Sequence, residues 1–236
     1  MFRKRPDASY ASSLLEEMGW VRHGFGTRRF PLGLDASPVA LLRQIHSART
    51  LAVDGAEGWA GEGDAMITAR PGQYLGIRTA DCLPVLLAAP DVRAVAAVHA
   101  GWRGAAAGIL RATIERLAED WGADPGRIVA AIGPGIGPCC YEVGPEVAGR
   151  FPIAAVRVLE SGCTHLDLRE AARRELVSAG VPEERIDVAD LCTRCRLEEF
   201  FSYRGNRAEG GRMRNVIGVW RPSAEERGAA GNLRRA

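Results

Sequence analysis

Three side chains of the kinds that bind zinc stand out in the sequence: His46, Cys82 and His99. One thiolate and two imidazoles make up the three-ligand set of a catalytic zinc site, which leaves the fourth tetrahedral position open for water or substrate. The spacings of 36 and 17 residues are too long for a structural zinc knuckle, so the fold would have to assemble the site. The residues alone leave open the alternative that Cys82 is a small buried hydrophobe and that each histidine is a hydrogen-bonded scaffold residue.

The other cysteines include two short groups. Cys192 and Cys195 form a Cys-x-x-Cys pair. Such a pair is a weak zinc signal without a second pair or a nearby histidine, and this one lacks the setting of a thioredoxin redox centre. We interpret it as structural or as part of a pocket wall. Cys139 and Cys140 follow the glycine-rich run 133–138, which either allows close backbone approach to a ligand or forms a plain turn. Six cysteines in 236 residues are too dilute for a disulfide scaffold, so we expect reduced thiols.

A candidate anion site follows His99. This residue ends an apolar run and precedes residues 100–104, which read AGWRG and predict a turn into a helix. Backbone N–H groups at a helix N-terminus carry partial positive charge, and Arg103 adds a planar cation, so the segment favours phosphate or another anion. Residues 200–207 interleave aromatic rings with arginines. That pattern could stack a base and hold a phosphate, and it is also ordinary interface composition.

The elements that must position these residues form a mixture of helices and strands. Amphipathic spacing predicts one helix after Gly104 that ends at Gly122, and a second helix from 167 to 178. Apolar runs predict strands over 74–77, 83–88, 92–98, 127–132 and 215–220. We therefore expect an α+β fold, with mixed β-sheets flanked by helices in a single compact domain over residues 1–220. Residues 221–236 have almost no large apolar side chains, which predicts a flexible C-terminal tail.

Composition excludes several classes of protein. The only lysine, Lys4, lies near the N-terminus, where it cannot be a Schiff-base lysine or a phosphate-loop lysine. Four histidines are too few for a multinuclear copper site. The formal net charge of +2 disfavours nucleic acid as a partner, and no apolar run reaches the roughly 18 residues of a membrane span. We expect a cytoplasmic protein that acts on a small molecule, as a monomer or a small homo-oligomer.

Five motifs, in order, resemble the signatures of the laccase-domain family. They are 44–47 (QIHS), 79–85 (TADCLPV), 99–104 (HAGWRG), 136–143 (IGPCCYEV) and 200–204 (FFSYR). These proteins were once called multicopper polyphenol oxidases and are now treated as purine nucleoside phosphorylases. Some bacterial members are named peptidoglycan editing factors. The resemblance runs from about residue 23 to residue 220.

The sequence departs from the family pattern in two places. After the N-terminal motif 23–28 (HGFGTR), only about fifteen residues precede Gln44, where the family usually has a longer segment that contains a helix. The late motif, typically Ser-Tyr-Arg-Arg-Asp, continues here with Gly205 and Asn206. Ser202 and Arg204 still match, and the resemblance makes them substrate-binding residues.

The resemblance implies a zinc ion held by His46, Cys82 and His99, and the count of four histidines argues against copper. It implies phosphorolysis of adenosine, inosine and methylthioadenosine to the free base and ribose 1-phosphate. It also implies zinc-assisted deamination of adenosine in the same pocket. The expected partners are therefore a purine nucleoside and phosphate, without nucleic acid or membrane.

A mechanism follows as a hypothesis. Phosphorolysis needs an anion cradle that faces C1′ of the ribose, and Arg28, Arg103 and Arg204 are the candidates, with the amides of 101–104. In deamination, His46, Cys82 and His99 would hold the zinc ion that activates water, and Asp81 would carry a proton. Neighbouring residues on a strand point to opposite faces, so Asp81 and Cys82 share a pocket only if the strand is broken or bulged there.

Three other functions compete with this hypothesis. A cysteine hydrolase or amidase would use Cys82 as nucleophile and His99 as base, without metal, on a peptidoglycan precursor. A non-catalytic nucleotide-binding module would need only the aromatic and arginine residues of 200–207. A copper oxidase fits the residues least well.

Overall fold

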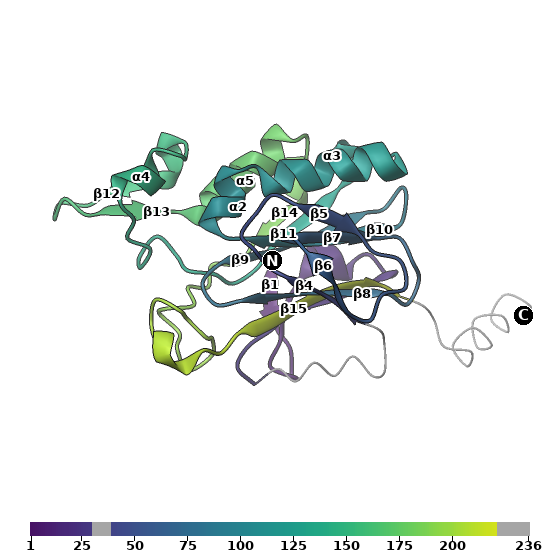
Figure 1. Cartoon of the computed structure of the whole chain (residues 1–236), viewed down its shortest axis with the longest axis horizontal. Helices are drawn as coiled ribbons and strands as arrows, with labels where there is room; N and C mark the ends of the chain where they lie inside the picture. The colour runs from purple at the N-terminus through teal and green to yellow at the C-terminus, as the bar shows by residue number, and fades with distance from the viewer. Residues whose placement is uncertain (30–38, 221–236) are drawn as a thin grey trace, which may run out of the picture.

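Two mixed β-sheets packed face to face, with helices over one of them, form the layers of the molecule (Figure 1). A computed structural model of the chain describes residues 1–29 and 39–220. The six-stranded sheet lies between the helices and the seven-stranded sheet, and it carries the longest buried strands. This central sheet therefore provides the rigid elements on which a site can be built.

The seven-stranded sheet has the strand order β1-β2-β3-β15-β8-β4-β6. Its strands are β1 (Phe2–Lys4), β2 (Tyr10–Ser12), β3 (Val21–Phe25), β4 (Val39–Arg43), β6 (Gly58–Glu62), β8 (Tyr74–Thr79) and β15 (Met213–Val219). β4 runs parallel to β6 and β8, and the other neighbours are antiparallel. β15, near the end of the described chain, pairs with both β3 and β8. It therefore lies in the same sheet as β1, β2 and β3 from the start of the chain.

The six-stranded sheet has the order β14-β11-β9-β10-β7-β5. Its strands are β5 (Thr50–Ala52), β7 (Ala65–Thr68), β9 (Leu83–Ala89), β10 (Ala94–Ala100), β11 (Val129–Ile132) and β14 (Ile186–Val188). β11 and β14 run parallel, as do β5 and β7, and the other pairs are antiparallel. A separate hairpin of β12 (Val156–Val158) and β13 (Thr164–Leu166) projects at the left of Figure 1.

The two long helices form where the amphipathic spacing predicts them. The α-helices are α1 (Ser13–Glu16), α2 (Trp102–Ala106), α3 (Ile109–Trp121), α4 (Pro145–Ala148) and α5 (Leu168–Ser178). Short 3-10 turns are η1 (Pro125–Arg127), η2 (Ile153–Ala155), η3 (Glu183–Arg185) and η4 (Arg207–Glu209). α3 ends at Gly122, whose φ of 73° is the left-handed conformation that glycine adopts at helix ends. Asp167 caps α5 by accepting a hydrogen bond from the Glu170 N–H at 3.2 Å.

The core lies on both sides of the central sheet. Leu83, Val85 and Leu87 of β9 pack on the helix side, whereas Leu86 and Ala88 pack between the two sheets. Every residue of β9 and β10 is buried, since each strand has a covered face on either side. This explains why both strands appear in the sequence as continuous apolar runs rather than as alternating ones.

The predicted α+β fold with mixed sheets flanked by helices is confirmed. The five predicted strands are present, with shifted ends: β10 begins at Ala94 because Arg93 has a positive φ of 50° in the preceding turn. The predicted C-terminal tail 221–236 and residues 30–38 of the short N-terminal segment lie outside the described residues. Within the described part of the chain, the structure contains no helix long and apolar enough to cross a membrane.

Candidate functional site

The structure brings His46, Cys82 and His99 together. One donor atom from each side chain lies within 4.8 Å of the others, and the two imidazole rings are 4.9 Å apart at an interplanar angle of 78°. β9 and β10 are antiparallel, with Leu83 opposite Ala100. Cys82 directly precedes β9 and His99 lies near the end of β10, so this pairing places the two side by side. His46 comes from the loop after β4.

A buried aspartate, Asp64, holds the His46 loop. Its side chain is fully buried and accepts hydrogen bonds from the backbone N–H groups of His46 at 2.9 Å and Ser47 at 2.6 Å. The Ser47 hydroxyl donates to the same carboxylate at 2.8 Å. His46 has a φ of 60°, which is unfavourable for a side chain larger than glycine. The carboxylate thus stabilises a strained loop conformation that presents the imidazole.

The same aspartate orients His99. The Nδ1 of His99 lies 2.8 Å from Asp64 Oδ1, so the carboxylate holds the proton on Nδ1, and Nε2 becomes a ligand atom when it releases its own proton. Burial raises the pKa of Asp64, but hydrogen bonds from His99 and Ser47 outweigh it and lower this pKa to about 2. Burial lowers the pKa of His99, but the Asp64 carboxylate and the Cys82 sulfur raise it to about 9.

Cys82 is half-buried between the two imidazoles. Burial raises the pKa of its thiol, but hydrogen bonding to His46 and His99 outweighs burial and lowers this pKa to about 6. The thiolate is therefore the main form at neutral pH. A Cβ on Gly101 would lie 2.9 Å from Cys82 Sγ and 3.1 Å from His46 Cδ2, so only glycine leaves room for the three side chains.

This donor set fits a single metal ion. Thiolate sulfur and imidazole nitrogen bind zinc at about 2.3 and 2.0–2.1 Å, so ligand atoms around one ion lie about 3.4–3.8 Å apart. The measured spread of up to 4.8 Å needs only small side-chain shifts to reach that value. A buried carboxylate behind a histidine ligand is the usual outer partner of such sites. His46, Cys82 and His99 could therefore hold a metal ion, with His46 on the exposed side.

Asp81 lies in a break between β8 and β9. Its φ of 84° interrupts the strand. Neighbouring residues on an unbroken strand would point to opposite faces, so this break allows Asp81 and Cys82 to face one pocket. The carboxylate is 6% exposed and accepts hydrogen bonds from Thr193 Oγ1 and the Arg204 N–H, both at 2.7 Å. Both oxygens are thus engaged, which favours a positioning role over the role of proton carrier predicted from the sequence.

Arg103, Arg204 and Tyr141 lie around the cysteine. Burial and the charge of Cys82 raise the pKa of Tyr141 to about 12, while the positive charges of Arg204 and Arg103 act in the opposite direction. The Arg204 guanidinium lies 5.2 Å from the centre of the Tyr141 ring. The Arg103 guanidinium stacks 4.5 Å above Trp102, and no hydrogen bond or ion pair from the described residues engages it. Arg103 is therefore available to an anionic substrate, whereas Arg204 also donates a hydrogen bond to the Glu142 carbonyl at 3.0 Å.

Arg28 is engaged elsewhere. Its guanidinium pairs with Glu209, donates to the Phe200 carbonyl at 3.0 Å and stacks over Phe201. Ser202 is buried, and its hydroxyl accepts a hydrogen bond from the Gly205 N–H at 3.0 Å, which holds the turn behind Arg204. These contacts engage Arg28 and Ser202 within the protein, and their direct contact with substrate stays a prediction.

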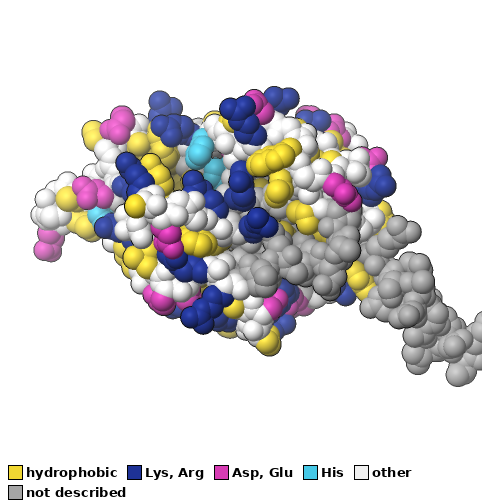
Figure 2. All heavy atoms as spheres, turned by 60° about the horizontal axis from the view of Figure 1, so that its bottom comes forward, with side chains coloured by type: hydrophobic (Ala, Val, Ile, Leu, Met, Phe, Trp, Pro, Cys, Tyr) yellow, Lys and Arg dark blue, Asp and Glu magenta, His cyan; other side chains and the backbone are white. Residues whose placement is uncertain are grey.

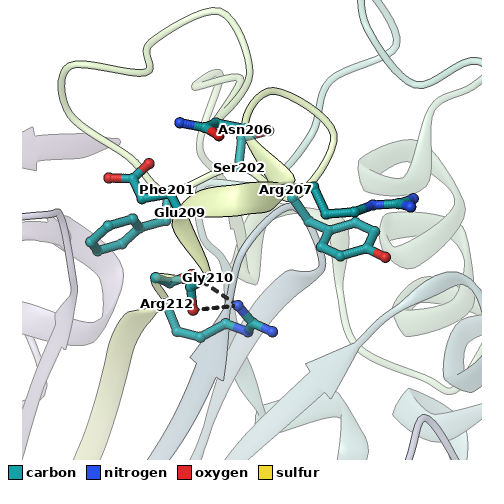
Figure 3. Close-up of a pocket in the computed structure, with 9 residues that line it drawn as sticks. Phe201, Ser202, Asn206, Arg207, Glu209, Gly210 and Arg212 are labelled. Atoms are coloured by element: carbon teal, nitrogen blue, oxygen red, sulfur yellow. Dashed lines mark hydrogen bonds between the residues drawn. The ribbon is translucent and has the colours of Figure 1, made fainter.

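A small cavity lies beside Ser202 (Figure 3). Its volume is about 10 Å³, room for no more than one water, so it cannot hold a nucleoside. It is lined by Phe201, Ser202, Tyr203, Asn206, Arg207, Glu209, Gly210, Gly211 and Arg212. Figure 3 shows the Arg212 guanidinium folded back on the carbonyls of Gly210 and Gly211. The turn is closed by its own residues and is not a substrate pocket.

Basic side chains lie beside histidine side chains on one face of the molecule. Figure 2 shows histidine side chains at the surface near the top of the view, with Lys or Arg side chains beside them. The other two histidines are scaffold residues by their contacts: His23 Nε2 accepts a hydrogen bond from the Ser12 N–H, and His165 Nδ1 lies 2.6 Å from the Pro138 carbonyl.

Sequence reasoning missed Asp64 and gave no role to Tyr141. The only sign of Asp64 in the sequence is that an acidic residue directly precedes the buried run 65–68. This position lies between His46 and Cys82 in the chain. Sequence reasoning also treated Cys139–Cys140 and Cys192–Cys195 as separate groups, although the structure places all four sulfur atoms within 4.8 Å of one another.

Comparisons with known proteins agree with this architecture. The family described as multi-copper polyphenol oxidoreductase laccase matches residues 25–220. A purine nucleoside phosphorylase from Deinococcus radiodurans is 43% identical over 192 residues, 80% of this chain and 73% of that protein. Adenosine deaminase RL5, from an unknown prokaryotic organism, is 37% identical over 211 residues, 83% of this chain and 79% of that protein.

Solved structures share the fold. YlmD from Geobacillus stearothermophilus superposes with a TM-score of 0.83 at 27% identity, over 93% of this chain and 99% of that one. The hypothetical protein YfiH from Bacillus licheniformis gives a TM-score of 0.82 at 29% identity, over 92% and 98% of the two chains. The family resemblance seen in the five motifs is thereby confirmed. This chain belongs to the multi-copper polyphenol oxidoreductase laccase family.

Proposed function

We propose that this protein is a purine nucleoside phosphorylase that also deaminates adenosine in the same pocket. The observation that carries the proposal is the convergence of His46, Cys82 and His99 in front of the buried Asp64. Arg103 and Arg204 lie beside it, and the chain is 43% identical to a relative named purine nucleoside phosphorylase. The relative named adenosine deaminase supports the second activity.

Phosphate binding rests on Arg103 and Arg204 in this proposal. The long helix α3 begins only at Ile109, and α2 has five residues, so the dipole of a long helix does not reach the site. Two guanidinium groups can each donate two hydrogen bonds to phosphate oxygens. They would hold phosphate against C1′ of the ribose and stabilise the charge that moves to the leaving purine. Arg28 would join only by leaving Glu209.

Zinc is the metal that we propose for His46, Cys82 and His99. When bound, zinc supplies Lewis-acid activation of water for attack on the purine C6. Asp64 keeps Nε2 of His99 directed at the ion, and Gly101 keeps the three ligands uncovered. Asp81 fixes the backbone of Arg204, so the metal ligands and the phosphate-binding arginine belong to one connected unit.

The substrates that we propose are inosine, adenosine and methylthioadenosine. Each combines a purine with a ribose that has a reactive C1′, so a phosphate held by the guanidinium pair serves all three, and the activated water serves adenosine. The proposed setting is the cytoplasm, with domain limits of 1–220. Peptidoglycan editing is the alternative physiological role.

The test is phosphate-dependent release of hypoxanthine from inosine by the purified protein. We expect Cys82→Ala and His99→Ala to lose several kcal/mol of transition-state stabilisation in this reaction, by analogy with other removals of residues at reacting centres. Cys163→Ala is the matched control, because Cys163 lies in the loop before β13 and should keep full activity. The absence of phosphate-dependent release of the free base from both inosine and adenosine would overturn the proposal.

A cysteine hydrolase is the second candidate, and one observation favours it. Cys82, His99 and Asp64 have the order of nucleophile, base and orienting carboxylate. A cysteine hydrolase does not need a second histidine beside its sulfur. The presence of His46 beside Cys82 therefore favours a metal site over a hydrolase. Iodoacetamide labelling separates the two: zinc should protect Cys82 from alkylation, whereas a free nucleophile reacts equally with and without zinc.

A further inference from the structure

Four cysteines from two distant segments converge away from the site described above. β11 and β14 are parallel neighbours, so the segments that follow them leave the same edge of the sheet. Gly135 forms a parallel bridge with Cys192, and the Thr193 N–H donates to the Gly135 carbonyl at 3.1 Å. This pairing brings the two cysteine groups together, although about fifty residues separate them in the chain.

We propose that Cys139, Cys140, Cys192 and Cys195 bind a structural zinc ion as a tetrathiolate. All four sulfur atoms lie within 4.8 Å of one another. Tetrahedral zinc with bonds of about 2.3 Å to sulfur separates its ligands by about 3.8 Å. The Sγ of Cys195 lies 3.5 Å from that of Cys139 and 3.4 Å from that of Cys140. A sulfur atom that shares an ion with others is expected to lie at similar distances from two of them. A sulfur atom in a disulfide would instead lie close to a single partner.

Groups around the sulfur atoms suit a negatively charged metal centre. The Gly137 N–H donates to Cys192 Sγ at 3.2 Å, and outer hydrogen bonds of this kind stabilise metal-bound thiolates. Arg194 donates to the Cys140 carbonyl at 3.2 Å. A Cβ on Gly137 would lie 2.8 Å from the Arg169 guanidinium and 3.3 Å from Cys139 Sγ. Arg194 and Arg169, the latter also paired with Asp190 at 3.0 Å, thus lie near a cluster that zinc and four thiolates would leave with a net charge of −2.

The bound ion would stabilise the wall of the proposed nucleoside pocket. Thr193, between the two cysteines of the second pair, is fully buried and donates to Asp81 at 2.7 Å. Tyr141 directly follows the first pair and lies next to Cys82. A metal that joins the two pairs would therefore fix both sides of the site without contacting substrate. The inference does not depend on the proposed function, since it rests on the four sulfur atoms alone.

Metal analysis of the purified, reduced protein tests the proposal. We expect the Cys82→Ser variant, whose His46 and His99 site is disabled, to retain one zinc ion per chain. The double variant Cys82→Ser/Cys192→Ser should retain none, whereas Cys82→Ser/Cys163→Ser, the matched control, should keep the single ion. Metal-free Cys82→Ser protein that titrates all five of its thiols in their reduced form would overturn the proposal. So would a disulfide within the cluster in protein purified without oxidant.

Cobalt substitution keeps the test decisive if the Cys82→Ser/Cys192→Ser variant fails to fold. Tetrahedral cobalt bound to four thiolates gives intense sulfur-to-metal charge transfer and visible absorption, which differ from those of a site with one sulfur and two nitrogens. We expect Cys82→Ser protein loaded with cobalt to show the tetrathiolate spectrum. A spectrum without thiolate charge transfer in this folded variant would contradict the four-cysteine site, whatever the activity of the enzyme.

Discussion

Asp64 is the single residue on which the geometry of the candidate site depends most. One buried carboxylate orients His99 and holds the loop of His46. We expect Asp64→Asn to weaken zinc binding by about 10–100-fold, because the amide cannot accept all of these hydrogen bonds and lets the His99 imidazole change tautomer. Competition with a chromophoric chelator measures the affinity.

Asp54→Asn is the control for this substitution. Asp54 is exposed and pairs with Arg70 at the surface, so its variant should bind zinc like the parent protein. Equal zinc affinity in Asp64→Asn and the parent would show that the carboxylate only supports the fold.

His23 makes stability depend on pH. Burial lowers the pKa of His23 to about 3, since the neutral ring accepts the Ser12 N–H. Between pH 6.5 and 3 the unfolded chain binds a proton that the folded chain does not, so acidification lowers the free energy of unfolding by about 1.4 kcal/mol per pH unit. This contribution is fully present above pH 6.5.

The measurement is urea unfolding of the parent and of His23→Gln at pH 6.5 and 5.0. The parent should lose about 2 kcal/mol more than the variant over this interval. An identical loss in both proteins would mean that another group causes the pH dependence.

At the scale of elements, the turn from β10 into α2 sets how closely the ligands approach. Gly101 has ordinary dihedral angles of −74° and 165°, so alanine meets no backbone strain there. Its Cβ would instead contact Cys82 and His46. We expect the Gly101→Ala variant to fold with a nearly unchanged melting temperature. Its zinc affinity should fall about tenfold, which is the lower end of the range for substitutions of groups that support metal ligands. Gly19→Ala, with open space at its Cβ, should change neither quantity.

The same elements show what could be predicted from the sequence. Apolar periodicity predicts helices α3 and α5 and strands β8 to β11. Each can be predicted because the pattern of apolar side chains that buries it lies within its own residues. The five motifs identify His46, Cys82 and His99, which the antiparallel pairing of β9 and β10 then brings together. Asp64 and the four-cysteine cluster could not be predicted, because each depends on which strands become neighbours. Parallel pairing of β11 and β14 leaves no local signal near Cys139 or Cys192.

At the scale of the whole molecule, β9 belongs to both cores. Leu87 packs on the helix side and Leu86 packs between the sheets, and both are fully buried. Because one strand joins the two cores, we expect the layers to unfold in a single transition. Leu86→Ala and Leu87→Ala should each lower the free energy of unfolding by about 2–5 kcal/mol, through lost burial and the cavity left behind.

Urea unfolding followed by both circular dichroism and tryptophan fluorescence measures this cooperativity. The two signals should change together in the parent and in both variants, because neither layer can keep β9 while the other loses it. Leu159→Ala is the control: its side chain is 43% exposed, so the expected change is within about 0.5 kcal/mol. If Leu86→Ala separated the two signals while Leu87→Ala did not, the sheet-to-sheet core would be an independent unit, and the positions of Cys82 and His99 would depend on the helix-side core alone.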